Sequence, residues 1–233
     1  MIISFSVTVL MGCVKATLSS IPISSVTVIN ATEGGTGIVP VFGDSMTEWF
    51  STAQSITPGS SYEYSIPSGQ TPTVARDLSD TAVNIFRGTL NLKPQGIYSF
   101  YFAASVSVTG KGAVDTLWMQ DLIPYYPTND SICGIRFVNL VVGGDPLEVN
   151  LVGNSYGSEL KGLAYKGVSA FKTYAGNIEL QYNFEIRDSN TDSLWAIYSY
   201  QNIATFKNVT IVCYGIFGSS FSPGINCFMV NNF

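Results

Sequence analysis

The chain has 233 residues, no histidine, a net charge of −5 and only 12% charged residues, about half the share of an average soluble protein. This composition excludes Ser-His-Asp and Cys-His catalysis and histidine–metal sites, and the acidic balance argues against electrostatic binding of nucleic acids. Because 46% of the residues are apolar, we expect a folded chain with one large or two small domains.

A short apolar segment, residues 2–11, begins the chain and is followed by Gly12 and Cys13. Its length of about ten residues is too short for a membrane-spanning helix, which needs roughly 20, but it is typical of the hydrophobic region of a signal peptide. Leu10-Met11-Gly12-Cys13 resembles a bacterial lipobox. The resemblance implies that Cys13 carries lipid and anchors the protein to a membrane. The alternative is a buried first strand, because residues 2–8 also alternate with period two.

Short alternating segments follow, separated by clusters of Gly, Pro, Asn and Ser. Examples are residues 26–29, 62–66, 98–102 and 104–108, all rich in β-branched or aromatic side chains. This pattern predicts β-strands, and no long apolar stripe with a helical period accompanies it. Turns about every ten residues favour an all-β sandwich.

The sequence repeats itself at an interval of about 110 residues. Residues 28–30 match 137–139, and residues 64–69 match 171–176, with offsets of 109 and 107. Matching segments that keep their order at a nearly constant offset indicate that the sequence was duplicated. We therefore predict four parts: a signal, lipobox and linker segment at 1–25, a first β-sandwich at 26–122, a proline-containing linker at 123–134 and a second β-sandwich at 135–233.

The second repeat carries a pattern of motifs found in a known family. It reads Gly-Ile-Arg-Phe-Val-Asn-Leu at 134–140, Leu-Ala-Tyr-Lys-Gly-Val-Ser at 163–169 and Val-Thr-Ile-Val-Cys-Tyr-Gly at 209–215. These segments resemble DUF4397, a domain family of unknown function in exported bacterial proteins, often in tandem. The resemblance implies two tandem Ig-like β-sandwich domains and no catalytic residues. The first repeat departs from the pattern, because Thr27 stands where Arg136 stands in the second.

Three polar residues are expected to have structural roles in the first strand of each repeat. Alternation places Arg136 on the face opposite Ile135 and Phe137. Asn30 and Asn139 hold equivalent positions in the two repeats, and their amides are expected to bond adjacent loop backbone, because buried polar groups need such partners.

Glu185, Asp188 and Asp192 form the densest group of carboxylates. Two carboxylates could serve glycoside hydrolysis, and clustered oxygens could bind Ca²⁺. However, Asp188-Ser-Asn-Thr-Asp192 has the composition of a β-turn and lacks the pattern of a calcium-binding loop. We therefore predict a turn, with no catalytic residue, no metal ligand and no cofactor.

Aromatic side chains are the most plentiful groups for binding, because Tyr and Trp offer large amphipathic surfaces. Alternation along 195–200 places Tyr198 and Tyr200 on the face opposite Trp195, and one of these faces must be core. Packing is the expected role of most of these aromatic residues. The candidates for contact with a ligand or partner are Tyr125, Tyr126, Trp195, Tyr198 and Tyr200.

Besides Cys13, the chain has Cys133, Cys213 and Cys227. An exported compartment permits disulfides, and Cys213 and Cys227 flank a loop and could pair. All three could equally be buried thiols, so the pairing stays open.

The sequence predicts a non-enzymatic, lipid-anchored protein of the cell envelope. Together the lipobox and the repeats look like a Bacteroidetes outer-membrane lipoprotein, on either side of that membrane. Its role would be a binding or adhesion module, or an accessory subunit of an outer-membrane complex. Expected partners are the membrane, through Cys13, and other outer-membrane proteins or glycans, but no nucleic acid. The alternative is a self-associating subunit of a surface filament, because low charge and alternating strands leave sheet edges free. A carbohydrate-active hydrolase is the third candidate.

Overall fold

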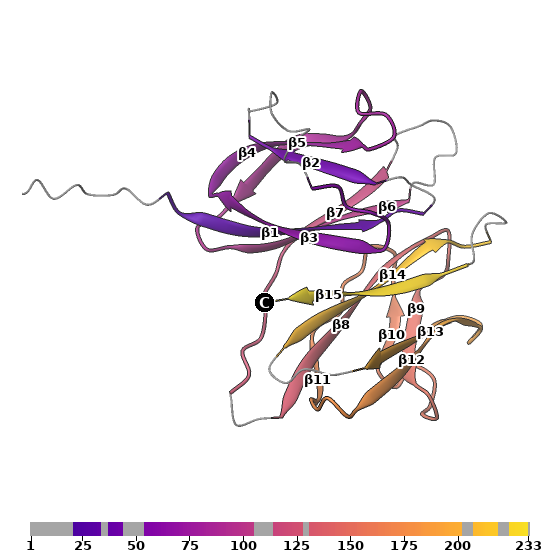
Figure 1. The fold of residues 1–233 in the computed structure, drawn as a ribbon. Coiled ribbons are helices and arrows are strands. Elements are labelled where there is room, and N and C mark those ends of the chain that lie inside the picture. Colours follow the sequence, from indigo (N-terminus) through magenta and orange to yellow (C-terminus); the bar gives the residue numbers. More distant parts are fainter. Residues whose placement is uncertain are drawn as a thin grey trace, which may run out of the picture.

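The computed structural model describes residues 21–33, 37–43, 54–104, 114–127, 131–201, 207–218 and 224–232. Every regular element among them is a β-strand, and the strands form two β-sandwiches stacked one on the other (Figure 1). This confirms the predicted all-β fold class. Over the same residues, we find no helix that is long and apolar enough to cross a membrane. The lipobox and Cys13 lie outside the described residues.

The first sandwich is built from two sheets, with strand orders β3-β1-β6-β7 and β2-β4-β5. Their inner faces enclose a core that includes Val26, Ile38, Leu90 and Phe100. The strands are β1 (Ile23–Ala31), β2 (Ile38–Phe42), β3 (Ser60–Pro67), β4 (Gly69–Asp77), β5 (Asn84–Leu92), β6 (Ile97–Ala104) and β7 (Val114–Gln120).

The second sandwich has the sheet orders β11-β8-β14-β15 and β10-β9-β12-β13. Ile135, Leu147, Phe184 and Ile211 lie in the core between them. The strands are β8 (Ile132–Val142), β9 (Leu147–Leu151), β10 (Leu160–Leu163), β11 (Lys172–Ala175), β12 (Gln181–Asp188), β13 (Leu194–Gln201), β14 (Asn208–Ile216) and β15 (Asn226–Asn232).

The two sandwiches repeat one topology. The order β3-β1-β6-β7 of the first returns as β11-β8-β14-β15 in the second, and in each sheet the two central strands run parallel. Both asparagines bond backbone, as predicted, although Asn139 reaches the last residue of β10 and not a loop. Asn30 donates to the carbonyl of Ile56 and Asn139 to that of Leu163, both at 2.8 Å. Each side-chain oxygen also accepts the backbone N–H two residues later.

The central strands of the two facing sheets are buried on both faces, because one face packs into its own sandwich and the other against the second sandwich. In β1, Val28 points into the first core, whereas Ile29 joins a third apolar cluster between the sandwiches. This interface cluster consists of Ile29, Ala31, Tyr101, Ala103, Val138, Leu140, Val212 and Val230. The alternation of β-strands thus builds three apolar layers from four sheets.

A buried ion pair crosses this interface. Ile135 and Phe137 enter the second core and Arg136 points the other way, as predicted. Arg136 Nη2 donates to Asp121, which follows β7 of the first sandwich, and Arg136 Nε donates to Thr210 Oγ1 at 2.8 Å. Ser99 donates to the second oxygen of Asp121 at 2.7 Å. The pair links the two sandwiches through side chains that are at most 3% exposed.

Candidate ligand-binding pocket

A pocket of about 440 Å³ opens in the first sandwich, between the edge strand β3, the end of β2 and the start of β4. Its lining comprises residues 42–43, 64–67 and 70–72. This volume lies within the roughly 300–1,000 Å³ that small-molecule sites occupy.

The pocket forms because β4 is longer than its neighbour β2. The two strands pair from Ile38–Asp77 to Phe42–Thr73, whereas β4 begins at Gly69. Gly43 N donates to the carbonyl of Pro72 at 2.8 Å, and this is where β2 ends. Because the amide nitrogen and carbonyl of one residue face the same side of a strand, the ring nitrogen of Pro72 faces the end of β2. Pro72 has no N–H to return a hydrogen bond to the carbonyl of Gly43, so the β2–β4 ladder ends at this pair.

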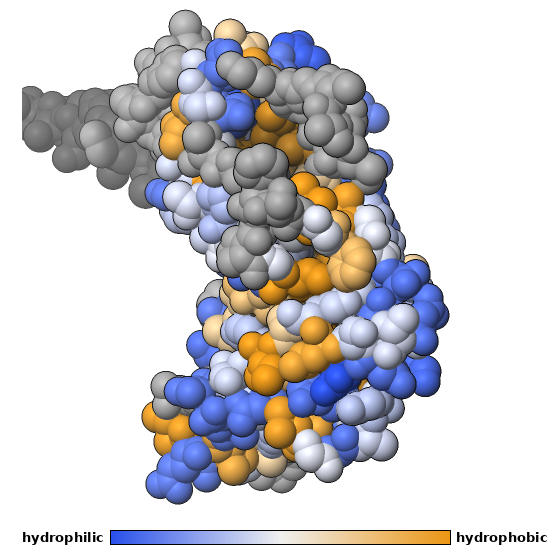
Figure 2. Space-filling view, turned by 90° about the vertical axis from the view of Figure 1, so that its right-hand side faces the viewer, coloured by the Kyte–Doolittle hydropathy of each residue, from blue (hydrophilic) through white to orange (hydrophobic). Residues whose placement is uncertain are grey.

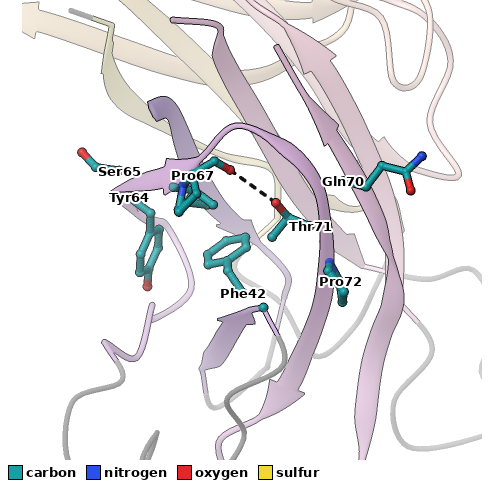
Figure 3. A pocket seen from close by; sticks show the side chains of 9 residues that line it. Phe42, Tyr64, Ser65, Pro67, Gln70, Thr71 and Pro72 are labelled. Atoms are coloured by element: carbon teal, nitrogen blue, oxygen red, sulfur yellow. Dashed lines mark hydrogen bonds between the residues drawn. The ribbon is translucent and has the colours of Figure 1, made fainter. Parts of the chain in front are cut away.

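Ring and proline side chains form the inner wall (Figure 3). Phe42 lies between Tyr64 on β3 and the Thr71–Pro72 segment of β4, while the side chain of Gln70 points away. The Phe42 and Tyr64 ring centroids are 5.2 Å apart and tilted by 58°. The exposed Tyr62 ring packs edge-on against Tyr64 at 5.0 Å and extends the aromatic surface beyond the pocket.

The lining residues carry no formal charge, because they are Phe, Gly, Tyr, Ser, Ile, Pro, Gln and Thr. Burial, with Tyr62 nearby, raises the pKa of the Tyr64 phenol, so this group stays neutral at physiological pH. Tyr64 Oη donates to the carbonyl of Gln54 at 3.3 Å. The pocket thus offers apolar ring surfaces and neutral hydrogen-bonding groups, and a neutral ligand fits it.

A second pocket, in the second sandwich, is smaller and has charged residues in its lining. There β11 takes the position of β3, and this pocket of about 200 Å³ lies beside it. Glu159 accepts hydrogen bonds from Lys172 Nζ at 2.7 Å and from Tyr174 Oη at 2.6 Å. Burial alone would raise the pKa of Glu159, but these hydrogen bonds hold it below its ordinary value. Strand β10 has no counterpart among the described strands of the first sandwich, and its first residue, Leu160, lines this pocket.

The predicted contact residues fall into two separate groups. Tyr125 and Tyr126 belong to the linker, where Tyr125 is 84% exposed and Tyr126 only 8%. Trp195, Tyr198 and Tyr200 lie on the edge strand β13 and pack on the second core. The core face of the strand is that of Tyr198 and Tyr200. Cys13 lies outside the described residues.

Burial determines what these residues offer to a partner. Tyr200 is 5% exposed, and its surroundings raise its pKa to about 12, chiefly by desolvation. The Trp195 ring lies on the face of β13 opposite Tyr198, and it packs on Phe217 with the ring centroids 5.5 Å apart. Of the five candidates, Tyr125 presents the largest surface. The linker tyrosines and the β13 aromatic residues thus lie in two separate places, and their contact with a ligand or partner stays a prediction.

The carboxylates take structural places. Asp188 Oδ1 accepts the backbone N–H groups of Asn190 and Thr191 at 2.8 and 3.1 Å, which confirms the predicted turn. Glu185 accepts a hydrogen bond from the side-chain amide of Asn150 and forms an ion pair with Arg187. Across the described part of the chain, no group of three or more acidic or cysteine side chains is arranged to hold a metal ion.

Glu148, on β9, is a fully buried carboxylate. Neither of its oxygens has a hydrogen-bond partner within the described residues, and Lys161 Nζ lies 3.9 Å from Oε2. Burial raises the pKa of Glu148, and the nearby Asp192 carboxyl raises it further. An ionised Glu148 is therefore costly to the fold.

Sequence reasoning missed the pocket residues Phe42, Tyr64 and Pro72. Alternation places Tyr62, Tyr64 and Ile66 on one face of β3, and this pattern could have indicated an aromatic surface there. The position of the pocket depends on where β2 stops relative to β4, which no local pattern reveals. The low charge of all three segments (42–43, 64–67 and 70–72) was the other available clue.

Comparisons with known proteins give distant structural matches only. No family model and no curated protein matches the chain, so the resemblance to DUF4397 stays a prediction. Structural neighbours include a family 26 carbohydrate-binding module from Eubacterium rectale solved with maltoheptaose (10% identity, 88% of this chain, 96% of that chain, TM-score 0.28). Others are the Bacillus anthracis TIE protein (7%, 82%, 50%, 0.26) and a proposed cell adhesion protein from Bacteroides eggerthii (8%, 90%, 95%, 0.24).

Proposed function

We propose that this protein is a non-enzymatic binding module of the cell envelope and that the pocket beside β3 takes a neutral ligand. The observation that supports this function is the uncharged, ring-lined pocket of about 440 Å³. General acid–base catalysis requires a positioned group that titrates near the working pH. The lining instead presents Phe42, Pro72 and a phenol whose pKa is raised. Binding is the chemistry that such a surface supports.

A neutral glycan is the ligand class that fits best. The faces of sugar rings are apolar and their edges are polar, and aromatic side chains with a polar tip match both. Tyr64 in the pocket wall and the exposed Tyr62 beside it supply such rings. On the face that Figure 2 presents, hydrophobic patches lie between hydrophilic ones.

The anchor and the compartment are part of the same proposal. Leu10-Met11-Gly12-Cys13 supports attachment through lipid at Cys13, which would hold the binding module on the outer membrane. Incorporation of labelled palmitate into the native protein, and its loss in Cys13→Ala, is the expected result. If the native protein stays unlabelled, the proposed lipid anchor is wrong, and the proposed ligand site is not affected.

A panel of neutral oligosaccharides tests the pocket. We expect at least one to bind the native protein, and we expect Tyr64→Ala and Phe42→Ala to weaken that binding tenfold or more, because both remove ring surface from the inner wall. Tyr125→Ala is the matched control, since it removes an 84% exposed tyrosine away from the pocket. Calorimetry gives the affinities, and thermal melts show whether each variant folds.

Two results would overturn the proposed ligand class. One is binding that Tyr64→Ala and Phe42→Ala leave unchanged in folded protein. The other is binding of charged oligosaccharides alone from a panel that holds both kinds.

A further inference from the structure

Cys213 and Cys227 face each other across two neighbouring strands. They are directly opposite in the antiparallel pair β14–β15, and their Sγ atoms are 3.1 Å apart. Opposite residues in such a pair have Cα atoms about 4.5–5.5 Å apart, within the roughly 4.4–6.8 Å that disulfides span. Bond formation needs the sulfurs to approach by about 1 Å, because a disulfide measures about 2.05 Å. Side-chain rotation supplies such a movement without a shift of the sheet.

The third described cysteine is too far away to compete. In the parallel pair β8–β14, Cys213 lies opposite Asn139, which is six residues along β8 from Cys133. At about 3.3 Å per residue, Cys133 lies roughly 20 Å away from the level of Cys213 along the sheet. Among the described cysteines, the geometry therefore selects one pair.

We propose that Cys213 and Cys227 form a cross-strand disulfide in the mature protein. The oxidant is a disulfide of a small thiol or of a thiol–disulfide exchange protein. The Cys227 thiolate attacks one sulfur of that disulfide, which releases one thiol and leaves a mixed disulfide. The Cys213 thiolate then attacks the sulfur of Cys227 and releases the second thiol. Two cysteine protons are lost, and the two electrons reduce the oxidant to two thiols.

The bond would fasten the last strand of the fold. Strand β15 is an edge strand that pairs with β14 alone among the described strands. It contributes Met229 to the second core and Val230 to the interface between the sandwiches. Loss of β15 would open both layers at once, so a covalent bond at Cys227 would protect more of the structure than one sheet edge.

Refolding with glutathione disulfide, followed by peptide mapping without reductant, tests the pair in the native sequence. We expect a linked peptide that joins Cys213 to Cys227, and Cys133 in the free form. The closed loop spans about 15 residues, which predicts a melting temperature higher by about 5–10 °C in the oxidised than in the reduced protein. Cys227→Ser is the test variant, because Cys227 is the more exposed partner. Its melting temperature should not respond to reductant.

Cys133→Ala is the matched control, since it removes a buried cysteine outside the pair, and its melting temperature should still fall on reduction. The proposal is wrong if the native protein keeps all thiols free after oxidative refolding. It is equally wrong if the linked peptide contains Cys133, or if reduction leaves the melting temperature of the oxidised native protein unchanged. The peptide map needs no variant, so it decides the question even where Cys227→Ser folds poorly.

Discussion

The buried ion pair between Arg136 and Asp121 makes a sharp prediction about how the two sandwiches hold together. The side chains are 3% and 1% exposed, so each charge depends on the other for its electrostatic compensation. Asp121→Asn removes the negative charge but keeps an amide oxygen, so the guanidinium is left with neutral contacts among the described residues, including the Thr210 hydroxyl and the Phe171 ring 4.6 Å from its centre. Removal of one partner from a buried pair costs about 3–5 kcal/mol.

This cost is a large part of the stability of an average domain, which is about 5–15 kcal/mol. A double-mutant cycle measures it, with Asp121→Asn, Arg136→Met and the double variant followed by urea unfolding. We expect each single variant to lose about 3–5 kcal/mol, and the double variant to lose clearly less than their sum, because it buries no unpaired charge.

Lys166→Ala is the control for this cycle. Lys166 pairs with Asp115 at 3.3 Å, and both side chains are about one-third exposed. Such pairs contribute about 0–1 kcal/mol. If Asp121→Asn also costs less than about 1 kcal/mol, or if the two single effects at the buried pair add within about 0.5 kcal/mol, then the pair does not couple the sandwiches and our reasoning fails.

Two further predictions concern buried polar groups. Burial raises the pKa of Glu148 in the fold above its usual value of 4.5, so its contribution to stability is fully present below that value and is lost as the pH rises through the raised pKa. We therefore expect Glu148→Gln to melt higher than the native protein at pH 7 and to lose this advantage near pH 4; an equal difference at both values would contradict this. For Asn139→Ala and Asn30→Ala we expect similar losses of about 1–3 kcal/mol each in urea unfolding, because each amide donates to a backbone carbonyl at 2.8 Å. A marked inequality would argue against equivalent roles.

Much of the architecture could be predicted from local patterns. Period-two alternation predicts strands, and in β8 it correctly places Arg136 opposite Ile135 and Phe137. The equivalent positions of Asn30 and Asn139 predict their bonds to backbone, because a buried amide must find partners wherever the fold repeats. These inferences succeed because each rests on interactions along one strand and the loop beside it.

The candidate site could not be predicted in this way. The pocket exists because β2 ends at Phe42 while β4 starts at Gly69, and strand register over such distances is a property of the sheet, not of either segment. The pairing of Cys213 with Cys227 likewise depends on register. The aromatic residues of β13 pack on the second core, as expected for most of them, because large rings fill cores as readily as they bind partners.

The stacking of the sandwiches contributes to the low charge of the chain. An ordinary sandwich exposes one face of each sheet, and charged residues occupy that face. Here two of the four sheets have no solvent-facing side along their central strands β1, β6, β8 and β14, where nearly every residue is buried. Arg136 is the one charged residue on these four strands, and its burial is offset by Asp121. The buried double layer is thus one cause of the 12% charged composition. Val138 and Val212 lie in the interface cluster, so a charge introduced at either would separate the two sandwiches instead of disturbing one surface.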